Sequence, residues 1–142
     1  MTTDFENNTW VINYSTDEYY NRKFSLAEDM QLSKKDKTIT WINTYGLNYM
    51  DEFRTVVLNN ELDDFLLRLL ANQNLGNKVI ELEEQLFIAV RILKTENQNL
   101  ESEQLFFVAG KDFIWCIQEK RGDHFDWIRA RIFDNKGIIR KK

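Results

Sequence analysis

The feature that most constrains this chain is a run of strand-like segments between residues 78 and 118. Apolar and β-branched residues gather in 79–82, 86–93, 104–109 and 113–118, and short polar stretches separate these segments. Consecutive strands joined by short connections pair antiparallel, because a parallel pair needs a crossover of a dozen or more residues. The run therefore predicts an antiparallel sheet rather than an alternation of strands and helices.

The remaining segments predict further strands and several helices. Strands are expected at 10–14 and 20–24, paired as a hairpin, and at 38–42, ending where turn-forming residues gather over 43–46. Helices are expected over 25–35, from Asn60, and after the capping residues Asn48 and Asp123. Strands and helices are thus partly segregated. The pattern predicts an α+β fold with a mixed, largely antiparallel β-sheet layered with α-helices.

Length and composition indicate one domain. The 142 residues are 43% hydrophobic and 30% charged, which is enough for one core, and no linker or repeat divides them. We therefore treat 1–142 as a single domain. Proline is absent, although average usage of ~5% predicts about seven. Turns must then be built from Gly, Asn, Asp and Ser.

Charge and cysteine content exclude several classes of function. The net charge of -4 and the pI near 5.1 give no broad cationic surface for nucleic acid. A single cysteine fits a reducing compartment, and no apolar run approaches the ~18 to 20 residues of a membrane-spanning helix, so this piece is expected to be soluble. Residues 111–142 carry a charge of +4, which we read as a solvated face rather than a membrane-binding tail.

The chemically useful residues do not form a catalytic motif. His124 is the only histidine and has the setting of a surface or capping residue, while Cys116 has that of a small buried hydrophobe. No Gly-rich phosphate loop is present, so we expect no enzyme and no tightly bound cofactor. Trp127 is a candidate exposed interface anchor. Acidic groups offer oxygen ligands to Mg²⁺ or Ca²⁺, but a solvated face is the favoured interpretation of Asp63, Asp64, Glu81, Glu83, Glu84, Glu101 and Glu103.

Two stretches of sequence resemble a known family. The first is Thr40-Trp-Ile-Asn-Thr-Tyr-Gly-Leu47; the second begins at Glu101-Ser-Glu-Gln104 and continues through Gln118-Glu-Lys-Arg-Gly-Asp-His-Phe-Asp126 to Arg129-Ala-Arg-Ile132 and Gly137-Ile-Ile-Arg-Lys-Lys142. In wording and order they resemble the cytoplasmic amino-terminal domain of CorA-type magnesium and cobalt transporters. The resemblance is strong over 38–142 and looser over 10–37.

The resemblance implies a regulatory and assembly domain of a divalent metal cation (Mg²⁺/Co²⁺) transporter. Such a domain contributes to a cytoplasmic funnel and to gating, within a homopentamer at the cytoplasmic face of the inner membrane. Its partners are its own subunits and divalent cations, either transported or regulatory. The stalk and membrane helices of the family do not occur in this sequence, so we expect the chain to be truncated before them.

One departure bears on metal sensing. Arg68 and Leu69 stand where the family has acidic ligands of a metal site between subunits, and neither attracts Mg²⁺. No metal ligand is therefore assigned, although Asp63 and Asp64, about one turn earlier, offer a substitute. Alternative interpretations are a free-standing cytosolic interaction module and the domain of a zinc-transporting relative. The backbone is expected to differ most from the family where proline is replaced, at Asp64, Asn77 and Trp127.

Overall fold

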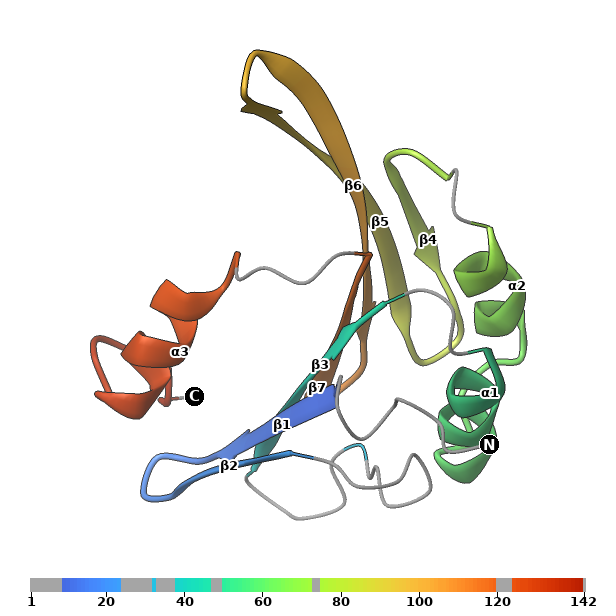
Figure 1. Ribbon diagram of the computed structural model, residues 1–142. Helices are drawn as coiled ribbons and strands as arrows, with labels where there is room; N and C mark the ends of the chain where they lie inside the picture. Colours follow the sequence, from blue (N-terminus) through green and yellow to red (C-terminus); the bar gives the residue numbers. More distant parts are fainter. Residues whose placement is uncertain are drawn as a thin grey trace.

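The computed structural model describes residues 9–23, 32, 38–46, 50–72, 75–119 and 124–141. Their strands form one seven-stranded sheet with the order β2-β1-β3-β7-β6-β5-β4 (Figure 1). The elements are β1 (Thr9–Tyr14), β2 (Tyr19–Lys23), β3 (Ile39–Tyr45), α1 (Met50–Asn59), α2 (Phe65–Ala71), β4 (Lys78–Glu81), β5 (Leu86–Glu96), β6 (Asn99–Ala109), β7 (Phe113–Gln118) and α3 (Asp126–Phe133).

The pairing of the strands confirms the predicted fold class. Five of the neighbouring pairs are antiparallel, including the predicted hairpin of β1 and β2 and the whole series from β4 to β7. The pair of β3 and β7 is parallel, with Thr40 opposite Phe113 and Tyr45 opposite Gln118. This pair joins the amino-terminal strands to the carboxy-terminal ones. The sheet is therefore mixed and largely antiparallel, as the sequence predicts.

Helices lie against both faces of the sheet (Figure 1). Helices α1 and α2 cover one face, where Phe53, Leu66 and Trp115 belong to the larger apolar core, and the rings of Phe53 and Trp115 meet edge to face with centroids 5.5 Å apart. Helix α3 covers the other face, where Ile132 packs in a smaller core with Cys116. Successive residues of β7 thus serve opposite cores, as expected for a strand with alternating side chains.

Two strands run further than predicted. The strand β3 continues through Asn43 to Tyr45, because Asn43 and Thr44 pair with both β1 and β7 and Tyr45 pairs with β7, so the predicted end at Asn43 is wrong. Strands β5 and β6 continue outward to Glu96 and Asn99, and Asn97 and Gln98 form the turn between them with φ of 50° and 67°. Two left-handed residues are what a tight hairpin turn with the native twist requires. The loop predicted over 95–99 is therefore mostly strand.

The helix predicted from Asn60 begins later. Helix α1 ends at Asn59, and Glu61 takes a left-handed φ of 53°, which no helix allows. Helix α2 begins at Phe65, whose N–H donates to Oδ1 of Asp63 at 2.9 Å. Glu61, Asp63 and Asp64 thus precede the helix instead of lying in its first turn. Except for Leu32, the predicted helix at 25–35 lies outside the described residues, as do the predicted caps Asn48 and Asp123.

Candidate functional site: a polar network on strand β6

Strand β6 buries polar side chains on both of its faces. Glu103 is 2% exposed and Gln104 is completely buried. Because neighbouring residues of a strand point in opposite directions, Gln104 lies on the α1 and α2 side with Phe106, and Glu103 lies on the α3 side. A buried amide or carboxylate is costly unless it is hydrogen-bonded. The stretch 101–104 therefore needs partners from both layers.

Gln104 binds the strands and the segment beside it. Its Oε1 accepts a hydrogen bond from Nη2 of Arg91 at 3.1 Å, and its Nε2 donates to the carbonyls of Gly76 at 3.0 Å and Val90 at 3.1 Å. Nη1 of Arg91 donates to Oγ of Ser102 at 3.0 Å. These contacts join β6, β5 and the segment that leads into β4. They lie at the base of the long hairpin, which is formed by β5 and β6.

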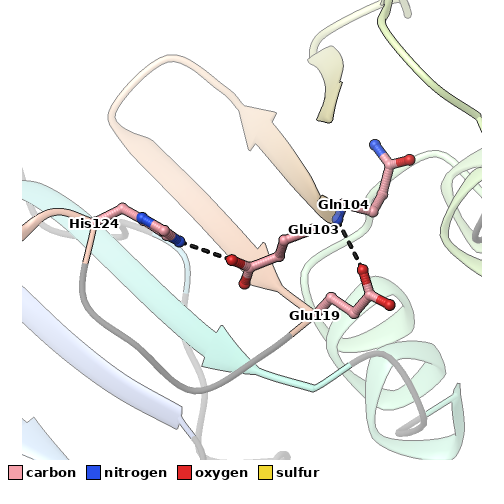
Figure 2. A network of polar contacts seen from close by, with 4 residues as sticks. All are labelled: Glu103, Gln104, Glu119 and His124. Atoms are coloured by element: carbon pink, nitrogen blue, oxygen red, sulfur yellow. Dashed lines mark hydrogen bonds and ion pairs between the residues drawn. The ribbon is translucent and has the colours of Figure 1, made fainter. Parts of the chain in front are cut away.

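Glu103 binds the segment that precedes α3. Its Oε2 lies 2.7 Å from Nε2 of His124 (Figure 2). On the next residue, the backbone N–H of Gln104 donates to Oε2 of Glu119 at 2.8 Å, and the N–H of Glu119 donates back to the carbonyl of Gln104. Glu103 thus connects β6 with the segment before α3, and the backbone of Gln104 connects it with the end of β7. The side chain of Gln104 reaches the opposite layer.

The structure corrects one prediction and confirms another. The prediction of a solvated acidic face is wrong for Glu103, because this residue is buried in β6 and its carboxylate is paired with His124. His124 itself is 28% exposed at its side chain and paired, so it is only partly a surface residue. Cys116 is the small buried hydrophobe that the sequence predicts. Burial raises the pKa of its thiol to about 12, although Nε1 of Trp41 donates to the sulfur.

Glu101 is half-buried on β6, and the other five acidic candidates lie apart from this network. Asp63, Asp64, Glu81, Glu83 and Glu84 are exposed, and no group of three or more His, Cys, Asp or Glu side chains within the described ranges could hold a metal ion.

The residues that replace the expected family ligands and prolines are also located. Arg68 is exposed on α2 and Leu69 is buried beneath it. Asp64 directly precedes α2, Trp127 lies exposed in the first turn of α3, and Asn77 precedes β4, where its Oδ1 accepts the N–H of Arg91 at 2.8 Å.

Sequence reasoning missed Arg91, Asn77 and Glu119 as members of the network. The available signal was Arg91, a single charge inside the apolar run 86–93. A long charged side chain in a half-buried strand needs a polar neighbour on the facing strand; Gln104 lies directly opposite Arg91, and Ser102 lies two residues further along the same strand. The register that brings them together cannot be read from composition.

Comparison with known proteins identifies the fold. No family model matches the sequence. The cobalt/magnesium transport protein CorA of Thermotoga maritima is 34% identical over 134 residues, which is 93% of this chain. This is a CorA-like domain. It spans 38% of the length of that relative.

Solved structures agree with this CorA-like fold. The full-length CmaX protein matches 92% of the chain with a TM-score of 0.68 and 13% identity, over 39% of its own length. The ZntB cytoplasmic domain from Vibrio parahaemolyticus matches 92% of the chain with a TM-score of 0.66 and 11% identity, over 52% of its own length. At such identities the likeness concerns the fold. None of the helices described in the CorA-like domain is long and apolar enough to cross a bilayer.

Proposed function

We propose that this CorA-like domain is the cytoplasmic regulatory and assembly part of a divalent metal cation transporter, with Mg²⁺ or Co²⁺ as the ion. The observation that carries the proposal is the 34% identity to a cobalt/magnesium transport protein over nearly the whole chain. The domain has no catalytic role. In the complete protein it assembles with its own copies as a homopentamer below the membrane, and the permeation path belongs to segments that this sequence does not include.

The polar network of β6 supports a role in gating. A regulatory domain must pass a displacement between its layers, and coupling of this kind runs through contiguous packed and hydrogen-bonded groups. Glu103 joins β6 to the segment before α3, and Gln104 joins it to the opposite layer. A shift of α3 relative to the sheet therefore reaches Arg91 and the base of the long hairpin through a single strand.

The proposed regulation differs from the family pattern in its ligands. Arg68 is a cation and Leu69 has no oxygen donor, so a metal site at those two positions is not part of the proposal. Asp63 and Asp64 are exposed and one turn earlier, although Oδ1 of Asp63 already accepts the N–H of Phe65. We infer that, where Asp63 and Asp64 supply the oxygen ligands, cation binding at contacts between subunits shifts the equilibrium between packing states of the funnel.

A transport assay on a chimera tests the proposal. The corresponding part of the Thermotoga maritima protein is replaced by this chain, and cation uptake into liposomes is measured with Mg²⁺, Co²⁺ and Zn²⁺ in separate arms. We expect Mg²⁺ or Co²⁺ uptake that still responds to internal Mg²⁺. A chimera that assembles but conducts without any such response would contradict a regulatory role, and a response to Zn²⁺ alone would favour the zinc-transporting alternative.

The parent gene gives a second test. We expect the reading frame to continue into apolar membrane helices. A frame that ends at Lys142 would contradict the transporter proposal and favour the free-standing interaction module.

A further inference from the structure

Helix α3 is apolar on two opposite sides. Its inner residues Ile128 and Ile132 pack in the smaller core against the sheet. Trp127, Ala130 and Phe133, each three residues apart, form a second stripe on the outer side, where Trp127 is 65% and Phe133 is 66% exposed. A surface helix normally has one apolar stripe, and a helix that is apolar all round is buried. The outer stripe of α3 therefore has the composition of a covered surface, although the described residues leave it largely open.

Cations surround this outer stripe. Residues 126–141 carry five basic and two acidic side chains, a net charge of +3. Arg131, Lys136 and Lys141 are exposed, and no carboxylate of the described residues forms an ion pair with them. Tryptophan and arginine are among the residues most enriched at the positions that dominate protein interfaces. We define the outer face of α3 by Trp127, Ala130, Arg131 and Phe133.

A surface of opposite charge lies in the other layer. The link between α1 and α2 and the turn between β4 and β5 border a hollow of about 300 Å³, and the N–H of Asp63 joins them through Oε1 of Gln85 at 3.4 Å. Four carboxylates and no cation line this hollow, and all four are exposed. The lining residues are Glu61, Leu62, Asp63, Glu83, Glu84 and Gln85. Like charges gathered in this way repel one another, so a cation placed at the hollow is favourable.

The hollow suits side-chain cations better than a metal ion. No group of three or more metal-binding side chains in the described part of the chain could hold such an ion, so the carboxylates are spread too widely to share one. Two exposed apolar side chains also adjoin the hollow. Leu58, 60% exposed, accepts the N–H of Glu61 at its carbonyl, and Phe65, 44% exposed, donates its N–H to Asp63. The acidic end, which we define as the hollow with Leu58 and Phe65, thus offers carboxylates beside an apolar surface.

The two surfaces lie too far apart to meet within one molecule. Helix α3 packs over β1, β3 and β7, whereas the acidic end adjoins the edge strand β4 on the side of α1 and α2 (Figure 1). A two-fold dimer needs a single patch that is complementary to itself. Separate complementary patches on opposite sides of the sheet instead fit a head-to-tail contact, which leaves one surface free at each end.

We propose that the outer face of α3 binds the acidic end of a second copy of this chain. Trp127 and Phe133 pack against Leu58 and Phe65 of the second copy, and Arg131 lies at its hollow. Repetition of this contact gives a ring when the rotation between copies closes. The inference rests on the proposed assembly of the domain with its own copies, and it assigns that assembly its contact surfaces.

Sedimentation of the whole chain at concentrations up to about 1 mM tests the contact, since this range reveals a complex with a millimolar Kd. We expect association that continues beyond the dimer and persists in EDTA. It should weaken when the ionic strength is raised from about 0.1 M to about 1 M, because the Debye length falls from ~10 Å to ~3 Å. A chain that stays monomeric overturns the contact, and association that EDTA abolishes overturns the pairing of Arg131 with the acidic end.

Two variants test the direction of the contact, and both change only exposed side chains. Trp127→Ser alters the outer face of α3 and should weaken self-association about thirtyfold, the effect of losing a dominant interface residue. Glu83→Gln combined with Glu84→Gln alters the acidic end and should reduce both the association and its salt dependence. The matched changes Leu100→Ser and Glu96→Gln, on the long hairpin, should leave association unchanged.

A mixture of the two variants gives the sharpest result. Each variant keeps one intact surface, and these two surfaces fit each other, so an equimolar mixture should form a heterodimer and nothing larger. A mixture that stays monomeric, or that forms higher oligomers, overturns the head-to-tail arrangement.

The transport chimera separates this contact from the proposed function. A chimera that conducts and responds to internal Mg²⁺, while the separate chain stays monomeric, overturns the contact and leaves the proposed function in place. Head-to-tail association of the chain, together with a chimera that does not respond to internal Mg²⁺, supports the contact and contradicts the regulatory role.

Discussion

The substitution Gln104→Leu tests whether the polar network of β6 holds the domain together. Leucine is similar in volume to glutamine, so the space stays filled, but the four side-chain hydrogen bonds of Gln104 are lost. The carbonyl of Gly76 loses this donor, the carbonyl of Val90 loses the side-chain bond but stays opposite Leu105 in the ladder, and Arg91 keeps Ser102. The change therefore isolates the hydrogen bonds from the volume of the side chain.

The expected loss can be worked out from these contacts. A buried group left unpaired costs ~1–3 kcal/mol, which applies to the carbonyl of Gly76, and the hydrogen bond lost at Val90 adds ~1 kcal/mol, while the guanidinium of Arg91 is only partly buried. We expect the free energy of unfolding to fall by ~2–4 kcal/mol. For a domain of this size ~1 kcal/mol corresponds to ~3 °C in the melting temperature, so the midpoint should fall by about 6–12 °C.

Urea unfolding followed by tryptophan fluorescence measures the change, since Trp115 is completely buried. Ser102→Ala is the matched control, because it removes one hydrogen bond to Arg91 and leaves both carbonyls paired; its cost should stay near ~1 kcal/mol. Hydrogen exchange should quicken in β4 and in the base of the long hairpin but not in β1 and β2. A Gln104→Leu variant as stable as the original chain would refute the reasoning.

Three further predictions concern single residues. The Cys116 thiol, with its pKa raised from 9.0 to about 12, should resist labelling at pH 8 until the chain unfolds. Because the thiol of the unfolded chain loses its proton at lower pH, the free energy of unfolding should decline between pH 9 and 12. The variant Cys116→Ala should flatten that decline. Glu103→Leu leaves His124 unpaired and should cost ~1–3 kcal/mol in urea unfolding, whereas adding His124→Ala should cost little more; full additivity would argue against the pair. Arg140→Ala should quicken trypsin cleavage near the carboxyl end with little effect on the melting temperature, because the guanidinium donates to the carbonyls of Ser15 and Glu18 in the β1–β2 turn. Arg140→Lys should not restore protection, since an ammonium group lacks the paired donors of a guanidinium.

Local patterns predicted the elements better than their ends. Strand β7 was predicted at its observed bounds, because an apolar run between Gly110 and a polar segment leaves little choice. The outer half of the hairpin was missed, since Lys94, Glu96 and Asn99 have little preference for strand and are held there by the pairing of β5 with β6. The start of α2 was misplaced because nothing in the composition indicates that Glu61 adopts a left-handed backbone.

The candidate site was predicted only as a motif. The residues 101–104 resemble the family, yet their acid was interpreted as a solvated group. Burial of Glu103 depends on α3 being folded against the sheet, and the role of Gln104 depends on the register of β5. Both are tertiary facts that no window of a dozen residues contains. Asn43 was likewise taken for a turn residue, since its pairing with β7 joins positions far apart in the chain.

The parallel pair of β3 and β7 also sets the order in which this domain can be completed during synthesis. The strands from β4 to β7 are joined by short connections and can zip in sequence, and the same holds for β1 and β2. The pair of Thr40 and Phe113 closes a loop that contains α1, α2 and three strands. Closure of so long a loop is slow and cannot precede the last strand. Until β7 leaves the ribosome, the inner edge of β3 is an open strand edge, and it is there that we expect a chaperone or a second nascent copy to bind.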